Sequence, residues 1–525
     1  MKISRRASVR VVALLAVVAL MGTACSSDDD SGQPSTSSTE AGGSVNRDGT
    51  LHLGYGLNQQ GNFTLDPTLL SSGTSMDPLW YLLYARLMRK LPDGSVTPDL
   101  AESAEVVDAN TIEVKVRPNQ TWQDGSVFDA DSVKAGLDRN LASNNVANLN
   151  AGFFAGGPTV TVVDPLTVKI NLPNGNAASW YDQYIAGIQT TILKPNPSMT
   201  QPIGAGPMKI AQYTPGSSMT LERFEDYWNA DEVKFKNIEM VSVEQQEPAS
   251  ALAALQSGQA DVVTLTTDQL SALSGDLEEL AVSDANRLMR FVTCKRDAPL
   301  DNVDIRKAIS LALDRQAISD AVYAGTAEPA TQLWPEGNRF YNTDIGDEMG
   351  YDPEAAKQLV QESGVANPEF DIYLLGSFSI PDVAAIAQQQ LAEVGITTNL
   401  KLTGNFVAEF LEPKLPGATF IPQTPAPGAL RLQTATGTGL GNLCGYQNPE
   451  LESLLTQLSK VSQESEEAKD IWWQIEEVYA RDVPTSPVLF ISLTGGYNTS
   501  KLVFEDAYAD GAWMVPDIYT SYMAG

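Results

Sequence analysis

Histidine and cysteine supply most of the bases, nucleophiles and soft metal ligands of proteins, and both are scarce in this chain. The 525 residues include one histidine, His52, and three cysteines, Cys25, Cys294 and Cys444. This scarcity excludes most Ser-His-Asp, Cys-His and multi-histidine metal sites. His52 itself lies in the alternating apolar run Leu51–Tyr55, which predicts a strand position instead of a catalytic one. We therefore expect no catalytic residues, no metal site and no cofactor, and we predict that the protein is not an enzyme.

Cys25 closes an N-terminal pattern of a different kind. Residues 2–10 carry four positive charges and no acid, and Val11–Met21 is an apolar run too short for an ordinary membrane span. We therefore predict a signal peptide over residues 1–24. The small residues before Cys25 resemble a bacterial lipoprotein processing site, with Gly22 where that pattern prefers leucine. We expect a lipid on Cys25; the alternative is ordinary signal cleavage near an unrelated cysteine, and the paired arginines leave the Sec and twin-arginine export routes both open.

Residues 25–48 are small and polar, with too little apolar surface to offset the entropy cost of ordering them. We expect a flexible, lipidated tether there, which places the folded part at the outer face of the cytoplasmic membrane. No later stretch is long and apolar enough to span a bilayer. The formal net charge of −31 argues against nucleic acid as a partner, because binding a phosphate backbone needs clustered lysine and arginine.

Cys294 and Cys444 remain once Cys25 is assigned to the lipid. Two cysteines in an exported protein most simply form a disulfide. The alternative is a pair of separate buried thiols. The sequence contains no Cys-x-x-Cys motif that would support redox catalysis.

Residues 204–228 form the most informative stretch of the sequence. Two apolar-alternating runs flank a Pro-Gly turn at 215–216, a pattern that predicts a β-hairpin. The stretch also carries, in order, Gly204, Gly206, Pro207, Leu221–Arg223, Tyr227 and Trp228. This ordered set strongly resembles the signature of family 5 of the bacterial extracellular solute-binding proteins, the peptide-binding-type receptors that serve ABC importers.

Other segments resemble the same family and together cover almost the whole chain after the tether. They are Leu65–Pro67, Pro98–Ser103, Trp122–Gly125, Phe128–Val133, Ala251–Val263, Pro299–Arg315 and Asn442–Glu450. The resemblance implies an α/β fold of the type II periplasmic-binding-protein kind, with two lobes, a hinge of two crossover strands and an extra subdomain. It places lobe I at 49–290, with the subdomain at about 85–200, lobe II at 291–494, and a return to lobe I at 495–525.

Periodicity and turn residues predict individual elements as well. Alternation predicts strands at 51–57, 111–117, 160–163, 166–172, 260–263, 396–402 and 488–491. Apolar stripes predict helices through 251–256, 309–315, 383–394 and 471–479, the second of them closed by Asp314 and Arg315. Aspartates precede several helices as N-caps and glycines follow them, namely Asp129 or Asp131, Asp352, Gly258, Gly364 and Gly395.

The resemblance implies the substrate-binding lipoprotein of an ABC importer. Such a protein captures a peptide or peptide-like solute between its lobes, closes by shifting an open–closed equilibrium, and delivers the solute to a membrane permease. We expect a monomer. In peptide-binding relatives, an aspartate in the loop that matches Phe420–Gly428 pairs with the peptide ammonium, and here that loop contains no acid.

An ammonium without a counter-charge in a closed cleft is costly. The alternative is therefore the same fold binding a non-peptide ligand, such as an oligosaccharide, an opine-like compound or a metal chelate. A third hypothesis is an extracellular hydrolase, for which we find no nucleophile–base pair.

The ligand-binding residues that we expect come from loops facing the cleft. Gln423 and Thr424 offer neutral hydrogen bonds in the loop without an acid, and Arg431 could pair with a carboxylate or form a surface salt bridge. Aromatic residues would form a pocket wall, with a core position as the alternative for each. A Cys294–Cys444 bridge would anchor the neighbouring loop to the crossover. The full set is Gln59, Asn62, Trp334, Phe378, Phe406, Gln423, Thr424, Arg431, Asn442 and Tyr446.

Overall fold

The structure, a computed structural model, describes most of the chain after the tether. The described residues are 45–524 apart from 58–62, 70–76, 92–94, 143–157, 188–189, 196–197, 199, 244–247, 296–297, 347, 375–378, 404–416, 424–443, 445 and 511–512. All the strands and helices predicted from periodicity fall within them.

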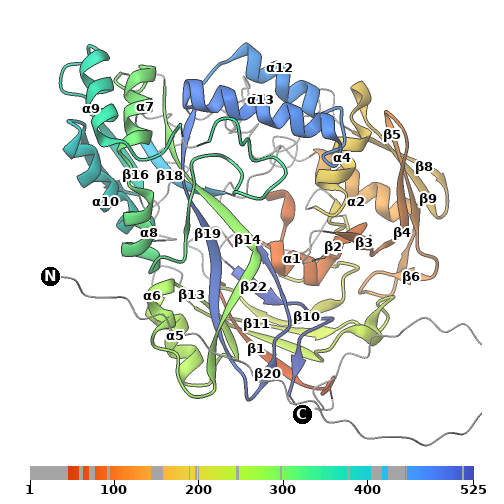
Figure 1. The fold of residues 1–525 in the computed structure, drawn as a ribbon. Coiled ribbons are helices and arrows are strands. Elements are labelled where there is room, and N and C mark those ends of the chain that lie inside the picture. The colour runs from red at the N-terminus through yellow and green to blue at the C-terminus, as the bar shows by residue number, and fades with distance from the viewer. Residues whose placement is uncertain are drawn as a thin grey trace, which may run out of the picture. The chain divides into compact units, whose positions relative to one another are not determined.

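Two long antiparallel strands, β14 (Leu277–Thr293) and β19 (Thr485–Asn498), lie side by side through the centre of the large sheet (Figure 1). Their ladder runs from the pair Leu277–Asn498 to the pair Val292–Thr485. The larger of its irregularities lies between Val282 and Arg287, where β14 advances five residues while β19 advances two. The predicted strand at 488–491 is thus only the middle of a longer one.

The large sheet contains eleven strands of the described chain, in the order β10-β11-β12-β1-β13-β19-β14-β18-β16-β17, with β15 also paired to β19. β1 is parallel to β12 and β13, β16 is parallel to β17 and β18, and the other pairs are antiparallel. The bounds are β1 Thr50–Tyr55, β10 Met208–Thr214, β11 Ser218–Arg223, β12 Asn237–Ser242, β13 Val262–Leu265, β15 Glu328–Pro329, β16 Glu369–Leu374, β17 Thr397–Leu402 and β18 Ala418–Gln423. This mixed sheet with helices confirms the predicted α/β class.

A second, antiparallel sheet in the order β4-β5-β9-β8 lies beside helix α2 (Figure 1). On β5 the predicted apolar face, Ile112, Val114 and Val116, is buried. Of the two candidate caps of α2, Asp129 is the one used, because its Oδ1 accepts the backbone N–H of Ser132. The bounds are β4 Ala101–Asp108, β5 Thr111–Val116, β8 Thr159–Asp164, β9 Thr167–Asn171 and α2 Ala130–Ala142.

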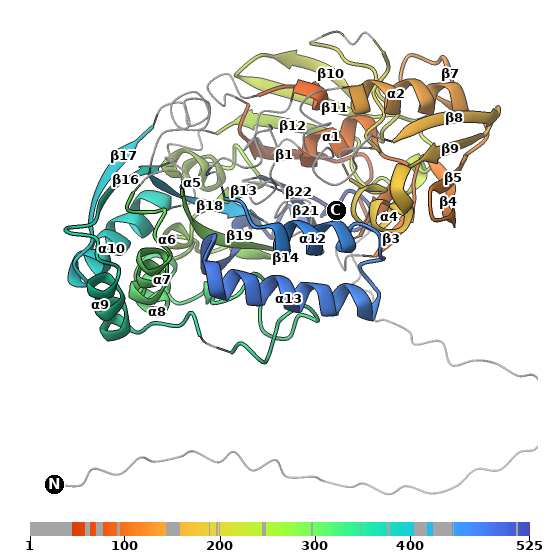
Figure 2. The ribbon, with the colours of Figure 1, turned by 90° about the horizontal axis from the view of Figure 1, so that it is seen from above.

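Helices α7 to α10 gather at the β16–β17 end of the large sheet (Figure 2). The helix predicted to close at Asp314 and Arg315 ends earlier, and Asp314 instead begins a new helix by accepting the Ala317 N–H. Leu402 also differs from expectation, since its side chain is 70% exposed at the end of the edge strand β17. The bounds are α7 Val303–Ala312, α8 Arg315–Tyr323, α9 Pro353–Glu362, α10 Ile380–Glu393, α12 Pro449–Leu458 and α13 Glu466–Asp482.

Short elements complete the described chain. The helices are η1 Pro67–Leu69, α1 Asp77–Tyr84, η2 Pro173–Gly175, α4 Ala177–Tyr184, η4 Ala230–Glu232, α5 Pro248–Gln256 and α6 Thr267–Leu270. The strands are β2 Met88–Lys90, β3 Val96–Pro98, β6 Gln120–Thr121, β7 Val127–Phe128, β20 Leu502–Val503, β21 Ala507–Asp510, β22 Trp513–Pro516 and β23 Tyr522–Met523.

Buried apolar side chains of the described residues form three clusters. The first gathers α1, β1, the second sheet, the 204–228 hairpin and the C-terminal strands. The second lies among α7, α8, α10 and the β16–β18 strands, and the third between α12, α13 and the loop that carries Trp334. Residues of β14 and β19 enter all three, so this pair of strands is shared by every cluster.

The predicted hairpin is present as β10 and β11, and its glycines are explained by close approach to α1. A Cβ on Gly204 or Gly206 would overlap the backbone of Leu83. Gln123 fastens the same junction, because its Nε2 donates to the carbonyls of Leu83 and Met208 at 2.8 and 2.7 Å while its Oε1 accepts the Gly204 N–H. Residues from the 122–125 and 204–228 motifs thus pack together at the end of α1.

Asp99, Tyr227 and Trp228 also come from two motifs and meet in the first cluster. The Asp99 carboxylate is 1% exposed and accepts the Tyr227 hydroxyl and the Trp228 indole N–H, the latter at 3.1 Å. Burial raises the pKa of this carboxyl, and these two donors oppose the rise. Tyr227 and Trp228, at the end of the hairpin signature, therefore have a structural role, which is to donate hydrogen bonds to the buried Asp99 carboxylate.

Two buried arginines from the 299–315 motif act in a similar way on backbone carbonyls. Arg306 donates to the carbonyls of Asp482 and Val483, which end α13, and to those of Leu300 and Asp301. Arg315 donates to Ala330, Pro487, Ser310 and Leu313. A planar guanidinium satisfies several carbonyls at once, so each arginine fastens segments that are distant in the sequence.

We predict that Arg315→Lys lowers the free energy of unfolding by about 2–4 kcal/mol, because lysine keeps the charge but leaves buried carbonyls without donors. Urea denaturation followed by tryptophan fluorescence measures the change. Arg481→Lys is the matched control, since Arg481 is half exposed and pairs with Glu450, and it should cost less than about 1 kcal/mol. Equal losses in the two variants would contradict the role assigned to Arg315.

Candidate functional site

Most of the predicted ligand-binding residues lie outside the described residues: Gln59, Asn62, Phe378, Phe406, Thr424, Arg431 and Asn442. Gln423 is described only by its backbone, which ends β18 opposite Leu288 of β14. The described side chains of the set are therefore Trp334 and Tyr446. Their roles in binding a ligand stay a prediction.

Trp334 is buried in the third cluster, at 9% exposure. Its ring lies 5.1 Å from that of Trp472, almost perpendicular to it, and 5.0 Å from that of Phe340. Such edge-to-face contacts are typical of an aromatic core. Its indole N–H has no hydrogen-bond partner within the described chain. Trp334 thus packs in the third buried cluster. A core position of this kind was the alternative to a pocket wall that the sequence had left open.

Tyr446 joins the end of α13 to the start of α12. Its hydroxyl donates to Asp482 Oδ2 at 2.8 Å and accepts from Asn448 Nδ2, while its ring lies 4.3 Å from the Lys295 ammonium. Burial and the Asp482 carboxylate raise the pKa of the Tyr446 hydroxyl. Tyr446 is therefore a fixed group, and it lines an open pocket of about 590 Å³.

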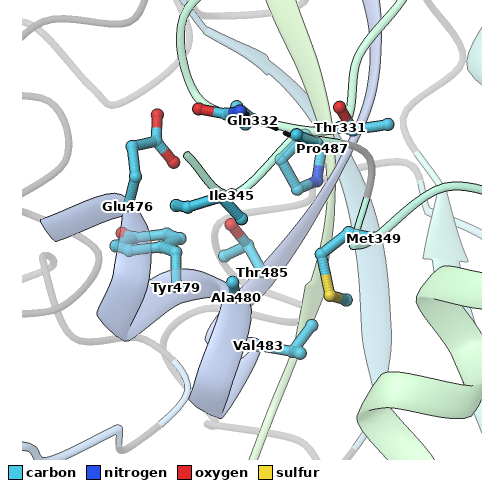
Figure 3. A pocket seen from close by; sticks show the side chains of 11 residues that line it. Thr331, Gln332, Ile345, Met349, Glu476, Tyr479, Ala480, Val483, Thr485 and Pro487 are labelled. Atoms are coloured by element: carbon cyan, nitrogen blue, oxygen red, sulfur yellow. Dashed lines mark hydrogen bonds between the residues drawn. The ribbon is translucent and has the colours of Figure 1, made fainter. Parts of the chain in front are cut away.

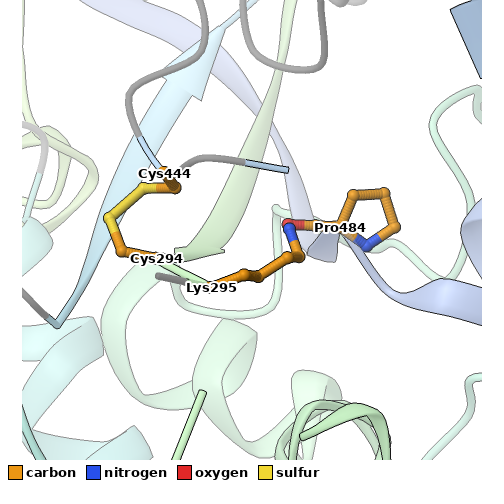
Figure 4. Close-up of a disulfide and its surroundings, with 4 residues drawn as sticks. All are labelled: Cys294, Lys295, Cys444 and Pro484. Atoms are coloured by element: carbon orange, nitrogen blue, oxygen red, sulfur yellow. A yellow bond between two sulfur atoms is a disulfide. The ribbon is translucent and has the colours of Figure 1, made fainter. Parts of the chain in front are cut away.

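A disulfide joins Cys294 to Cys444 just after β14 ends (Figure 4). Next to it, the Lys295 backbone N–H donates to the Cys444 carbonyl at 2.9 Å, and the Lys295 ammonium donates to the Pro484 carbonyl at 2.7 Å. The chain between Gln423 and Cys444, which holds three of the predicted ligand residues, is consequently attached to β14 at both of its ends.

A small internal pocket lies between α13 and the loop around Gln332 (Figure 3). Its volume of about 10 Å³ suffices for one water molecule. Glu476 and Tyr479 border it from α13, and Thr485 borders it from β19. The hydroxyl of Thr485 is buried and has no hydrogen-bond partner in the described part of the chain.

Glu476 is the buried acid of this pocket, at 2% exposure. Its Oε1 accepts the Leu333 backbone N–H at 2.9 Å. Burial raises the pKa of the carboxyl to about 8, although hydrogen bonds from the backbone of Leu333 and Trp334 lower it. Glu476 was not predicted from the sequence, although its spacing of four from Trp472 and three from Tyr479 places it on the buried face of α13.

A polar contact joins α4 to the turn between α12 and α13. Asp182 Oδ2 accepts the Ser462 hydroxyl at 2.6 Å and the Gln463 backbone N–H at 2.8 Å. Ser179 adds a hydrogen bond to the Leu458 carbonyl. Because α4 belongs to the first cluster and α12 and α13 to the third, this contact links the two clusters through residues outside β14 and β19.

His52 has a structural role, as predicted from its strand. It lies on β1, and its Nδ1 is 2.8 Å from Asp261 Oδ2, a buried carboxylate that also accepts from Lys501. Within the described ranges, no three His, Cys, Asp or Glu side chains are grouped so that they could hold a metal ion. Among the same residues no helix is long and apolar enough to cross a membrane.

Residues 95–417 match the family model described as bacterial extracellular solute-binding proteins, family 5 middle. A curated relative is the glutathione-binding protein GsiB of Salmonella paratyphi A, which is 28% identical over 322 residues, covering 59% of this chain and 61% of the relative. The chain thus matches about three fifths of the length of such relatives.

Two solved structures show the same fold. One is the ABC transporter-associated periplasmic binding protein DppA from Helicobacter pylori in complex with the peptide STSA, with a TM-score of 0.77, 17% identity, and coverage of 91% of this chain and 98% of that one. The other is the PBP AgaA from A. tumefaciens R10 in complex with agropinic acid, with a TM-score of 0.74, 21% identity, and coverage of 87% and 95%. These matches confirm the predicted periplasmic-binding-protein fold.

We predict that Glu476→Gln reduces the pH dependence of stability. The unfolded chain releases this proton near the ordinary pKa of 4.5, whereas the folded chain keeps it until about pH 8, so unfolding becomes easier as the pH rises between these values. Relative to the wild type, the melting temperature of the variant should therefore rise progressively from about pH 5 to about pH 8.

Glu477→Gln supplies the matched control, because it changes the same chemical group on the exposed side of the same helix. Thermal melts of the three proteins across the pH series provide the measurement. If the difference between the wild type and Glu476→Gln stays constant with pH, the buried carboxyl is not the titrating group.

Proposed function

The chain belongs to the bacterial extracellular solute-binding proteins of family 5, and on this basis we propose that it is the substrate-binding component of an ABC importer. It captures a peptide or peptide-like solute between two lobes and delivers it to a membrane permease. Binding and release carry out this function, and no covalent step is part of it.

The observation that carries this proposal is the interrupted ladder between β14 and β19. On one side of the interruption, Leu280 and Leu493 pack in the first cluster; on the other, Met289 and Leu489 pack in the second. A two-strand connection with an irregular middle is a suitable hinge, since a few residues there absorb the rotation of the parts on either side. We accordingly propose that the lobes meet at this interruption, with lobe I up to about residue 282 and again from about residue 493, and lobe II between about 287 and 491. The bounds expected from the sequence, 49–290 and 495–525 for lobe I and 291–494 for lobe II, thus shift by a few residues in this proposal.

The Asp182 contact supports closure of these lobes. It joins Asp182 of the proposed lobe I to Ser462 and Gln463 of the proposed lobe II, and none of these residues belongs to the strands of the proposed hinge. A contact of this kind forms only when the lobes approach each other, so it favours the closed member of an open–closed equilibrium.

Peptides are the first candidate for the solute, because the DppA structure holds a peptide and the GsiB relative is named for glutathione. A non-peptide solute is the second candidate. It is favoured by the 420–428 segment, which offers no carboxylate to a peptide ammonium, and by the agropinic acid complex of AgaA.

We further propose that Cys25 carries a lipid and that residues 26–48 tether the protein to the outer face of the cytoplasmic membrane. The family description supports an extracellular location, and the basic, apolar and small-residue order of the first 25 residues supports lipid attachment.

Native mass spectrometry of the protein produced without residues 1–25 tests the proposed function. Bound masses that differ by amino-acid residues would establish a peptide receptor, and one discrete non-peptide mass would establish the second candidate. Absence of any bound solute, together with turnover of general ester or peptide substrates, would replace both candidates with a hydrolase.

We predict that Asp182→Ala weakens binding of the solute so identified by about three- to tenfold, because closing loses a charge-assisted hydrogen-bond pair at a partly exposed site. Small-angle scattering should show a larger radius of gyration for the variant at a partially saturating solute concentration. Asp231→Ala removes an exposed acid of lobe I far from this contact and should change neither quantity. Wild-type affinity and scattering in Asp182→Ala would rule out a role in closure.

A further inference from the structure

An open pocket of about 590 Å³ lies at the C-terminal end of α13. The Asp182 contact involves the turn before the N-terminus of the same helix, and seventeen residues of helix, about 25 Å, separate the two. The pocket is therefore remote from the contact between the lobes. It is lined by Lys295, Asp301, Val303, Arg306, Lys307, Tyr446, Gln447, Arg481 and Asp482.

The lining has an excess of two positive charges, because four cations face two carboxylates. This is unusual in a chain whose formal net charge is −31. One carboxylate, Asp482, is already occupied by Tyr446, Asn448 and Arg481, and Arg481 also pairs with Glu450. These two lining groups thus neutralise each other within the protein.

Within the described chain, the remaining cations of the lining have no directly bonded carboxylate. Arg306 donates only to backbone carbonyls, and the Lys295 ammonium donates to the Pro484 carbonyl. Lys307 makes no hydrogen bond or ion pair with any described residue. Asp301, the second carboxylate of the lining, is exposed and in no ion pair within the described chain, and the carboxylates of Asp301, Asp304 and Asp482 all favour the charged form of Arg306 without accepting a hydrogen bond from it.

The Lys295 side chain lies in a partly buried position next to a second cation. Burial and the neighbouring Arg306 lower the pKa of its ammonium well below the ordinary value. In its protonated form Lys295 donates one N–H to Pro484 and faces the Tyr446 ring at 4.3 Å, which leaves donor capacity for an anion that would stabilise the ammonium, next to the ammonium of Lys307. An oxyanion in the pocket would compensate both charges.

We propose that this pocket binds a phosphate group, either as the free anion or at the end of a small molecule. A phosphate monoester carries a charge of about −1.5 to −2 at neutral pH, which matches the excess of the lining. Ammonium groups bind phosphate through charge-assisted hydrogen bonds. The pocket is larger than a bare phosphate, and its volume is in the range of small-molecule sites, which leaves room for an attached organic part.

Isothermal titration of the full chain with inorganic phosphate and with glycerol phosphate, at constant ionic strength, tests this proposal. The wild type should bind with one saturable site, and Lys307→Gln should weaken that binding about tenfold through loss of one charge-assisted partner. Tighter binding of glycerol phosphate would identify a phosphorylated small molecule as the ligand, and tighter binding of inorganic phosphate would identify the free anion.

Lys460→Gln is the control, because it removes the same charge from an exposed position just after the C-terminal end of α12, whereas the pocket residues Tyr446 and Gln447 precede the N-terminal end of that helix. Lys307→Gln should melt like the wild type without phosphate, since Lys307 makes no hydrogen bond or ion pair with the residues that the structure describes. Absence of saturable binding at millimolar phosphate, or equal weakening in the two variants, would overturn the proposal, because the effect would then be general screening of charge.

Discussion

The pairing of β14 with β19 is the interaction on which the rest of the structure depends. Each strand places side chains in all three buried clusters, so every cluster is held in register by the same ladder. Backbone hydrogen bonds fix both halves of this ladder, whereas the segment between Val282 and Arg287 leaves several β14 residues without a β19 partner. The two strands consequently connect all three clusters. Their inter-strand pairing is interrupted between Val282 and Arg287, and this is where we expect the connection to deform most easily.

Buried polar side chains then fasten the remaining segments to this ladder. Arg315 bridges α7 and the loop at Ala330 to Pro487 of β19, and Arg306 holds the carbonyl end of α13 beside α7. Gln123 performs the same task at the Leu83–Gly204 junction. Unpaired buried carbonyls are costly, so the role of these side chains is to satisfy the backbone and hold the fold together. They do not indicate which ligand the protein binds.

This division explains how far the sequence alone could predict the protein. The hairpin, the Asp129 and Asp352 caps and the buried stripe of α10 follow from local periodicity and turn chemistry, and the family signature adds the topology. The second helix beginning at Asp314 was missed because its cap was interpreted as a stop. Glu476 was missed because a single acid within an apolar stripe looks like an exposed position, although its partners at Leu333 come from a distant loop. Residues that bind a ligand are brought together by tertiary contacts, which local patterns do not determine, so the predicted ligand-binding set stays a prediction.

The attachment of residues 424–443 at both ends has an evolutionary consequence. β18 precedes these twenty residues and the Cys294–Cys444 bridge follows them, so the two flanking positions are both fixed. The entropy cost of connecting two fixed points by a chain segment grows only slowly with the length of the segment. Substitutions, insertions and deletions between the two anchors therefore cost the fold little, so this segment can diverge in sequence and length while the ladder and its buried arginines stay the same.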